Sequence, residues 1–162
     1  MPEIDDLMKQ PVEKVMVRKV VFIKIDQTLE TMVTLLREKG ISGMPVLDKD
    51  GKVCGVATEY DLVNFLSEKA KTRIKFPIEL FTLDRRDRLN SLKLLDEFKT
   101  TKVSEIMTSP AITATPSTSI RDVIALMVRN EINRIPIVHD GKPVGIVTRA
   151  DIVLALSEKG KE

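Results

Sequence analysis

Two short segments of this chain carry the same polar residues at the same spacing. Residues 55–61 read GVATEYD and residues 145–151 read GIVTRAD, so Thr58 and Asp61 recur as Thr148 and Asp151. Each threonine stands where an apolar, strand-like run gives way to a helix. The free N–H groups and positive dipole end of a helix N-terminus suit a phosphate. A threonine hydroxyl there can donate to a phosphate oxygen, and the aspartate can accept two hydrogen bonds from a ribose diol. The pattern therefore fits a nucleotide site.

The same residues also form a helix-capping sequence. A threonine at the N-cap with an acid three residues later is a capping box, which stabilises a helix by about 1 kcal/mol and requires no ligand. Gly55 and Gly145, three residues before each threonine, would let a ligand approach the backbone closely. Capping and binding are compatible, and the residues alone leave both interpretations open.

Both segments belong to an internal duplication that covers most of the chain. Residues 41–63 read ISGMPVLDKDGKVCGVATEYDLV, and residues 132–153 read INRIPIVHDGKPVGIVTRADIV. The shared register extends back to two short lead-in segments, residues 12–16 and 103–107, which read VEKVM and VSEIM. A register held over this length indicates two copies of one structural unit.

Each copy predicts the order strand–helix–strand–strand–helix, an α/β unit that buries one face of its sheet against helices. Helices are expected over residues 28–39 and 119–130, where apolar residues recur at i, i+3, i+4 and i+7. They are Leu29, Met32, Val33 and Leu36 in the first copy, and Ile120, Val123, Ile124 and Met127 in the second. Gly40 is expected to end the first helix in the left-handed conformation. Asp50-Gly51 and Asp140-Gly141 predict tight hairpins with positive φ at both central residues.

Residues for catalysis are hard to find outside the repeated segments. The one histidine, His139, aligns with Asp48 beside the hairpin turn, so a polar surface role is expected. The one cysteine, Cys54, aligns with Val144, which predicts a buried thiol acting as a small hydrophobic residue. No Ser-His or Cys-His pair recurs, and a P-loop and a G-x-G-x-x-G sequence are absent. We therefore expect no enzyme, no catalytic cofactor and no metal site.

Composition narrows the class of protein. With 162 residues, 43% of them hydrophobic and no tryptophan, the two copies are expected to share one aliphatic core. The net charge of +2 argues against a dedicated nucleic-acid binder, which needs clustered, uncompensated Lys and Arg. No apolar run approaches the roughly 20 residues that span a bilayer. The acidic N-terminus, MPEIDDLMKQ, does not resemble a signal peptide. A cytoplasmic protein is expected.

The segment between the copies is not part of the repeat. We divide the chain into residues 1–71, a linker over residues 72–101 and residues 102–162. The linker predicts an amphipathic helix with one apolar face of Leu89, Leu92, Leu95 and Phe98. This helix could lie on its own domain or contact a second copy or another partner. The basic stretch over residues 69–75 is expected to be the solvated end of the preceding helix.

The repeated motifs resemble the CBS domain family, named after cystathionine beta-synthase, arranged as a tandem pair or Bateman module. The matching features are I-x-x-h-P-V-h-D from Ile41 and from Ile132, the D-G turn, G-h-h-T-x-x-D, and the V-x-x-h-M lead-in segments. The resemblance implies two β-α-β-β-α repeats packed through their sheets with pseudo-twofold symmetry and two clefts. It also implies binding of an adenosyl compound (AMP, ADP, ATP or a relative of S-adenosylmethionine) and a regulatory role.

The resemblance assigns roles to individual residues. Asp61 and Asp151 would hold ribose hydroxyls, with Thr58 and Thr148 at the ribose or phosphate. The frame of the adenine would come from Ile41, Ser42, Gly43, Ile132, Asn133 and Arg134, with a further ligand contact at Thr108 after the second lead-in segment. Each cleft would take its adenine frame from one copy and its T-x-x-D from the other.

The two copies differ at one position where related modules place a phosphate-binding basic residue. Arg134 occupies this position in the second copy and Gly43 in the first. We hypothesise that the cleft of Thr148, Asp151 and Arg134 prefers a charged nucleotide. The other cleft would be weaker or would suit an uncharged adenosyl group.

The sequence thus predicts a stand-alone CBS pair, as a homodimer, that signals an adenosyl ligand to an unidentified effector protein. One alternative is a structural or dimerisation module with unoccupied clefts, in which the T-x-x-D segments are only caps. A second is a nucleic-acid-associated regulator that uses residues 69–75, against which the balanced net charge argues.

Overall fold

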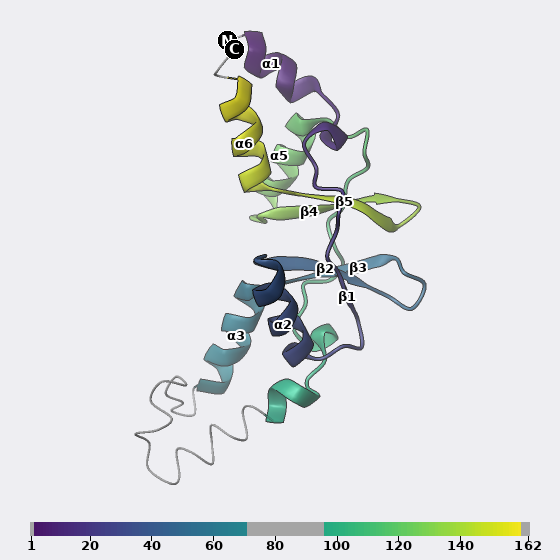
Figure 1. The fold of residues 1–162 in the computed structure, drawn as a ribbon, viewed down its shortest axis with the longest axis vertical. Helices are drawn as coiled ribbons and strands as arrows, with labels where there is room; N and C mark the ends of the chain where they lie inside the picture. The colour runs from purple at the N-terminus through teal and green to yellow at the C-terminus, as the bar shows by residue number, and fades with distance from the viewer. Residues whose placement is uncertain (1, 71–95, 160–162) are drawn as a thin grey trace.

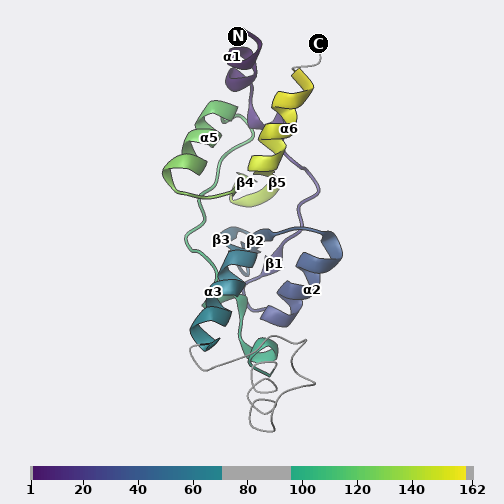
Figure 2. The same ribbon diagram turned by 90° about the vertical axis from the view of Figure 1, so that its left-hand side faces the viewer.

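The computed structural model describes residues 2–70 and 96–159. Two similar halves are stacked along the long axis, with their strands in the middle and most of their helices towards the outer ends (Figure 1). A view turned by 90° shows the same stacking (Figure 2). The predicted α/β fold, with two repeats that face each other through their sheets, is confirmed.

The first half contains the predicted order of elements. They are β1 (Ile23–Lys24), α2 (Leu29–Lys39), β2 (Gly43–Leu47), β3 (Val53–Thr58) and α3 (Glu59–Ala70). β1 pairs with β2 in parallel and β2 with β3 antiparallel, so the strand order is β1-β2-β3. A crossover through α2 joins the two parallel strands, as a parallel connection requires.

The second half repeats this order with a reduced first strand. Its elements are α5 (Ile120–Arg129), β4 (Arg134–His139), β5 (Lys142–Thr148) and α6 (Arg149–Lys159). β4 and β5 form an antiparallel pair. In the position of β1, a single parallel bridge joins Ala114 to Ile137. The helix α1 (Pro2–Lys9) lies at the N-terminus. Two short 3-10 helices, η1 (Val12–Lys14) and η3 (Val103–Glu105), lie in the first and the second lead-in segment.

The two amphipathic helices begin and end at the residues that the sequence indicates. The Thr28 hydroxyl accepts from the Thr31 N–H before α2, and the Ser119 hydroxyl accepts from the Asp122 N–H before α5. Gly40 ends α2 with a φ of 61°, the left-handed conformation that favours glycine. Each helix buries three of its predicted apolar residues: Leu29, Met32 and Leu36 in α2, and Ile120, Val123 and Met127 in α5.

The two hairpin turns differ, and the prediction of a positive φ at both central residues is wrong for the first copy. Asp140 and Gly141 have φ values of 50° and 78°, as a two-residue turn requires. In the first copy only Gly51 has a positive φ. That turn is one residue longer, and the Asp48 carboxylate accepts hydrogen bonds from the Asp50 and Lys52 N–H groups, both at 2.9 Å. These bonds hold the longer loop without a left-handed aspartate.

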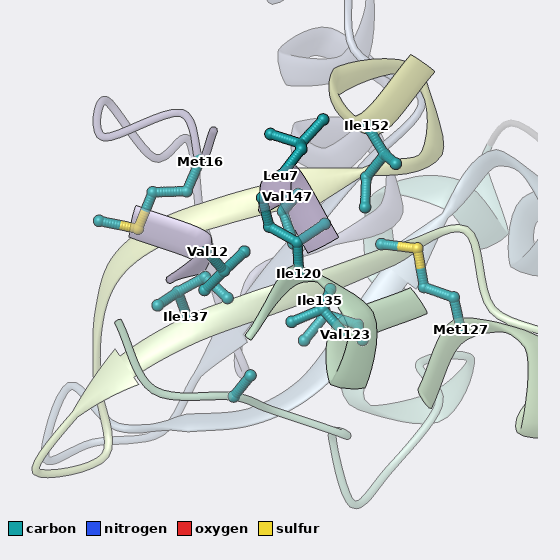
Figure 3. Close-up of a cluster of buried hydrophobic side chains, with 11 residues drawn as sticks. Leu7, Val12, Met16, Ile120, Val123, Met127, Ile135, Ile137, Val147 and Ile152 are labelled. Atoms are coloured by element: carbon teal, nitrogen blue, oxygen red, sulfur yellow. The ribbon is translucent and has the colours of Figure 1, made fainter. Parts of the chain in front are cut away.

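The single shared core predicted from composition is also wrong, because the structure has two cores. The residues of the second core are drawn in Figure 3; they include Leu7, Val12 and Met16 from the start of the chain. The first core in turn takes Val103 from the second lead-in segment, with Ile106 and Met107 packed against it. The exchange of lead-in segments therefore joins the two halves.

Backbone hydrogen bonds anchor each exchanged segment at the start of the other copy's helix. The Val12 N–H donates to the Thr118 carbonyl and the Val103 N–H to the Gln27 carbonyl, both at 2.8 Å. Each lead-in segment thereby supplies a fully buried valine to the opposite core. Neither copy is complete without the other, which explains how units of about 50 residues can each hold a core.

Only the last part of the linker can be compared with its prediction. Residues 96–100 are helical, and the Phe98 ring lies 5.7 Å from the Phe65 ring of α3 in an edge-to-face arrangement. Lys69 Nζ forms an ion pair with Glu97 at 2.9 Å. This end of the linker thus packs on its own domain. The other predicted apolar residues, Leu89, Leu92 and Leu95, lie outside the described residues.

Candidate ligand-binding site

The capping box is present in both copies with the same geometry. Asp61 Oδ2 accepts from the Thr58 N–H and hydroxyl, both at 2.7 Å, and the Thr58 hydroxyl accepts from the Asp61 N–H at 3.3 Å. Thr148 and Asp151 make the same three bonds at 2.7, 2.7 and 3.3 Å. The duplication therefore preserves the geometry of this motif and not only its residues.

This geometry separates the roles of the two side chains. The threonine proton is directed to the aspartate, so the threonine orients the carboxylate and is not poised to donate to a phosphate. Oδ1 of Asp61 and of Asp151 makes no hydrogen bond within the part of the chain that the structure describes. An ionised carboxylate accepts through both oxygens, so each aspartate retains an oxygen that could receive a hydroxyl group.

The predicted adenine-frame loops lie beside the T-x-x-D of their own copies. Gly43 pairs with Thr58 across β2 and β3, and the Ser42 carbonyl accepts from the Glu59 N–H at 3.0 Å. In the second copy Arg134 pairs with Thr148, and the Asn133 carbonyl accepts from the Arg149 N–H at 3.0 Å. The backbone thus places each frame loop beside the T-x-x-D of its own copy, and the pairing of each loop with the T-x-x-D of the other copy stays a prediction.

The segments that do cross between the copies are the lead-in segments. Thr108, which directly follows the second one, is exposed and pairs with Val56 of β3 through bonds of 2.9 and 3.0 Å. It thus lies two residues along β3 from Thr58, close to the first candidate site. Val17, the equivalent residue of the first copy, pairs in the same way with Ile146.

The two repeated glycines accommodate methionines of the lead-in segments. A Cβ atom on Gly55 would lie 2.7 Å from Met107 Sδ and 2.9 Å from the Thr108 carbonyl oxygen. A Cβ atom on Gly145 would collide with Met16 Sδ in the same way. Close approach is required here, as expected, but by a methionine of the opposite copy. Gly55 and Gly145 stand at equivalent positions of the two copies, and the sequence alone suggested that this repetition served the approach of a ligand.

The side chain of Arg134 extends from the second copy to the first. Its Nη1 donates to the Gly43 carbonyl at 2.9 Å and its Nη2 to the Ser42 hydroxyl at 2.6 Å, so the guanidinium is engaged by the first copy. The buried Nε has no partner. A Cβ atom on Gly43 would lie 2.9 Å from Arg134 Cζ. Gly43 and Arg134 occupy equivalent positions in the two copies, and together they form one complementary contact between the copies.

The electrostatic surroundings of this contact belong to the first copy. Burial lowers the pKa of the Arg134 guanidinium, and the carboxylates of Glu59 and Asp61 oppose that shift. The second copy has Arg149 where the first has Glu59, directly after each threonine. The sequence analysis missed this reversal of charge, although aligning the two copies position by position reveals it.

The remaining candidates for chemistry are isolated. The side chain of His139 is 75% exposed and lies 3.6 Å from Asp140, a surface role as predicted. Cys54 is half-buried; its Sγ donates to the Val46 carbonyl at 3.4 Å, and burial, followed by Asp48, raises the pKa of its thiol. Among residues 2–70 and 96–159 there is no cluster of His, Cys, Asp or Glu that could hold a metal ion. None of the helices in these ranges is long and apolar enough to cross a membrane.

Comparison with known proteins places this geometry in a family. The CBS domain model matches residues 12–68 and 103–158. The chain is 37% identical over 160 residues to the uncharacterized protein MJ1426 of Methanocaldococcus jannaschii, covering 94% of this chain and 90% of that one. Several other curated relatives are longer, and the chain spans about half of their length.

Solved structures show the same arrangement. The CBS domain of a CBS domain containing membrane protein from Sphaerobacter thermophilus superposes with a TM-score of 0.73 and 28% identity, covering 94% of this chain and 91% of that one. A structure of CBSX2 in complex with AMP superposes with a TM-score of 0.68 and 25% identity, covering 92% and 97%.

Proposed function

This chain belongs to the CBS domain family, and on that basis we propose that it is a regulatory module that binds adenosyl compounds at its two T-x-x-D segments. Each site would consist of the aspartate, the threonine that orients it, and the loop of the same copy. For the first site these residues are Thr58, Asp61 and residues 41–43, with Thr108 alongside. For the second they are Thr148, Asp151 and residues 132–134.

One observation carries this proposal: the same carboxylate is held in the same way twice, with one oxygen satisfied and one available. A cap alone needs only the oxygen that faces the helix N-terminus. The loop of the same copy is hydrogen-bonded to the first residue of the same helix, an arrangement suited to a ribose whose base contacts that loop. The AMP complex of CBSX2 supports the adenosyl class of ligand.

Thermal shift tests the proposal. We expect AMP, ADP, ATP, adenosine, 5'-methylthioadenosine or S-adenosylmethionine to raise the melting temperature. A ligand at 100 times its Kd stabilises by about 2.7 kcal/mol, which corresponds to roughly 5–10 °C for a chain of this size. The control is the double variant Asp61→Asn/Asp151→Asn, which should lose the shift.

No shift with any of these compounds would favour the alternative of a structural module. The satisfied capping boxes are the observation that supports that alternative, because caps stabilise helices whether or not a ligand is present. The two cases differ in one measurable respect. In a purely structural module, the aspartate variants change the stability, but the wild type has no ligand response for them to remove.

We also propose that the module acts in the cytoplasm as a homodimer that regulates an effector protein. Val63 of α3 and Val153 of α6 are equivalent in the two copies and are 60% and 64% exposed. A repeated apolar position of this kind suits burial against a second copy with the same repeat. Light scattering coupled to size exclusion tests this: the wild type should be a dimer and the Val63→Asp/Val153→Asp variant a monomer. A monomeric wild type would remove the proposal.

A further inference from the structure

The two candidate sites share the geometry of their capping bonds and differ in charge. Their capping bonds have the same lengths, and each loop carbonyl bonds to the first N–H of the helix at the same distance. These shared features cannot distinguish one ligand from another. What differs is the residue that follows each threonine, Glu59 in the first site and Arg149 in the second, and the guanidinium of Arg134 that reaches the first site.

Arg134 does not make the first site attractive to an anion. Two of its nitrogens already donate to Gly43 and Ser42, and its Nε is buried without a partner. The carboxylates of Glu59 and Asp61 both act on its guanidinium. Two negative groups therefore face one engaged positive group, and the first site has an excess of negative charge.

The second site has the opposite character. Arg149 is exposed at the first position of α6, and within the described ranges its side chain makes no hydrogen bond or ion pair. Among the described residues of the first copy, no guanidinium hydrogen-bonds to this site, and Gly43 stands at the position equivalent to Arg134. The exposed Arg149 thus accompanies the carboxylate of Asp151.

Arg149 is also the wrong residue for the helix alone. The first turn of a helix favours negative side chains, because the dipole is positive at that end, and Glu59 follows this rule in α3. A cation at the same position of α6 opposes the dipole. Departures from such local rules are expected where a residue serves function instead of folding.

We infer that the two sites bind adenosyl ligands of different charge, and that Glu59 and Arg149 set the difference. This inference rests on the proposed function. The site of Thr148 and Asp151 takes a phosphorylated nucleotide, whose monoester carries about −1.5 to −2 charges at neutral pH. The site of Thr58 and Asp61 takes an uncharged adenosyl compound. Arg134 is a positioning residue that joins the copies and does not contact the phosphate.

The test exchanges the two charges. Calorimetric titrations with AMP and with adenosine use the wild type, Arg149→Glu, Glu59→Arg and the double variant Glu59→Arg/Arg149→Glu, which keeps the net charge. Both positions are exposed, so the fold should tolerate these changes, and Arg149→Gln provides a milder second variant. Asp61→Asn and Asp151→Asn, added singly to each background, identify which site binds.

In the wild type we expect Asp151→Asn, and not Asp61→Asn, to remove AMP binding. Arg149→Glu should weaken AMP binding about 10- to 100-fold, because it changes the charge of the site by two units, and should change adenosine binding less than about twofold. The double variant should bind AMP at the first site.

Three results would have different meanings. If adenosine binds but AMP keeps the same site and affinity in the double variant, the assignment of charge is wrong while the proposed function stands. If neither AMP nor adenosine binds the wild type, this inference fails; the proposed function fails with it only if no adenosyl compound raises the melting temperature. A loss of AMP affinity that follows Arg134→Lys, with no effect of Arg149→Glu, would return the phosphate role to Arg134.

Discussion

The exchange of lead-in segments makes a sharp prediction: truncating Val12 should weaken the second half of the protein, although Val12 belongs to the first copy by sequence. The Val12 side chain is fully buried in the second core (Figure 3). Val12→Ala removes the equivalent of two methylene groups, a transfer loss of about 1.6 kcal/mol. A residual cavity brings the expected cost to about 2–3 kcal/mol. The melting temperature should fall by roughly 5–10 °C.

Native-state hydrogen exchange locates the loss. In Val12→Ala, protection should fall first at the amides of α5, β4 and β5. Val103→Ala is the matched variant, because Val103 is equally buried in the first core, and its effect should appear first in α2, β2 and β3. Val128→Ala, on the exposed side of α5, should cost less than about 0.5 kcal/mol.

The opposite pattern would refute the reasoning. If Val12→Ala reduced protection in β2 and β3 while α5 and β4 kept theirs, each lead-in segment would pack on its own copy in solution. A cost no larger than that of Val128→Ala would show that Val12 is not part of a core.

Three further outcomes follow from the contacts described above. Thr58→Ala and Thr148→Ala should each cost about 1 kcal/mol in urea unfolding, and equally, because their capping bonds have the same lengths; a clear inequality would contradict the equivalence of the two caps. Arg134→Ala should lower the free energy of unfolding by about 1–2 kcal/mol. Arg134→Lys should not restore it, since an ammonium cannot reach Gly43 and Ser42 together as the guanidinium fork does. Full rescue by lysine would show that only the charge matters. The Cys54 thiol should be alkylated by iodoacetamide more slowly than a free cysteine at pH 8, because burial raises its pKa and keeps it protonated. Its alkylation rate should rise at a higher pH than that of a free cysteine. A rate equal to that of a free thiol would contradict this.

The local features of the fold were predictable from short stretches of sequence. The bounds of α2 and α5 and the left-handed Gly40 follow from capping and from apolar periodicity, which depend on residues within a few positions of each other. The longer turn at Asp48 was mispredicted because a side chain replaced the backbone geometry that Asp-Gly usually requires. In the candidate site, the capping bonds of Thr58 and Asp61 were predictable for the same local reason.

Contacts between the copies were not predictable in this way. A methionine opposite Gly55 and a guanidinium opposite Gly43 are separated from their partners by the linker and parts of both copies, and periodicity carries no information about such pairs. The duplication does not identify the partners, because two equivalent segments can pack on their own copy or exchange places with the same composition and the same apolar area.

The sequence by itself determined that this chain is a CBS pair with two T-x-x-D segments, because repeated motifs of local geometry are readable without knowing what they pack against. Only the tertiary structure decided which lead-in segment completes which core, and that Arg134 reaches the first copy through the space left by Gly43. The physical reason is that burial and charge depend on neighbours brought together by folding. A residue type states what bonds a side chain can make, but its surroundings decide which of them remain available to a ligand.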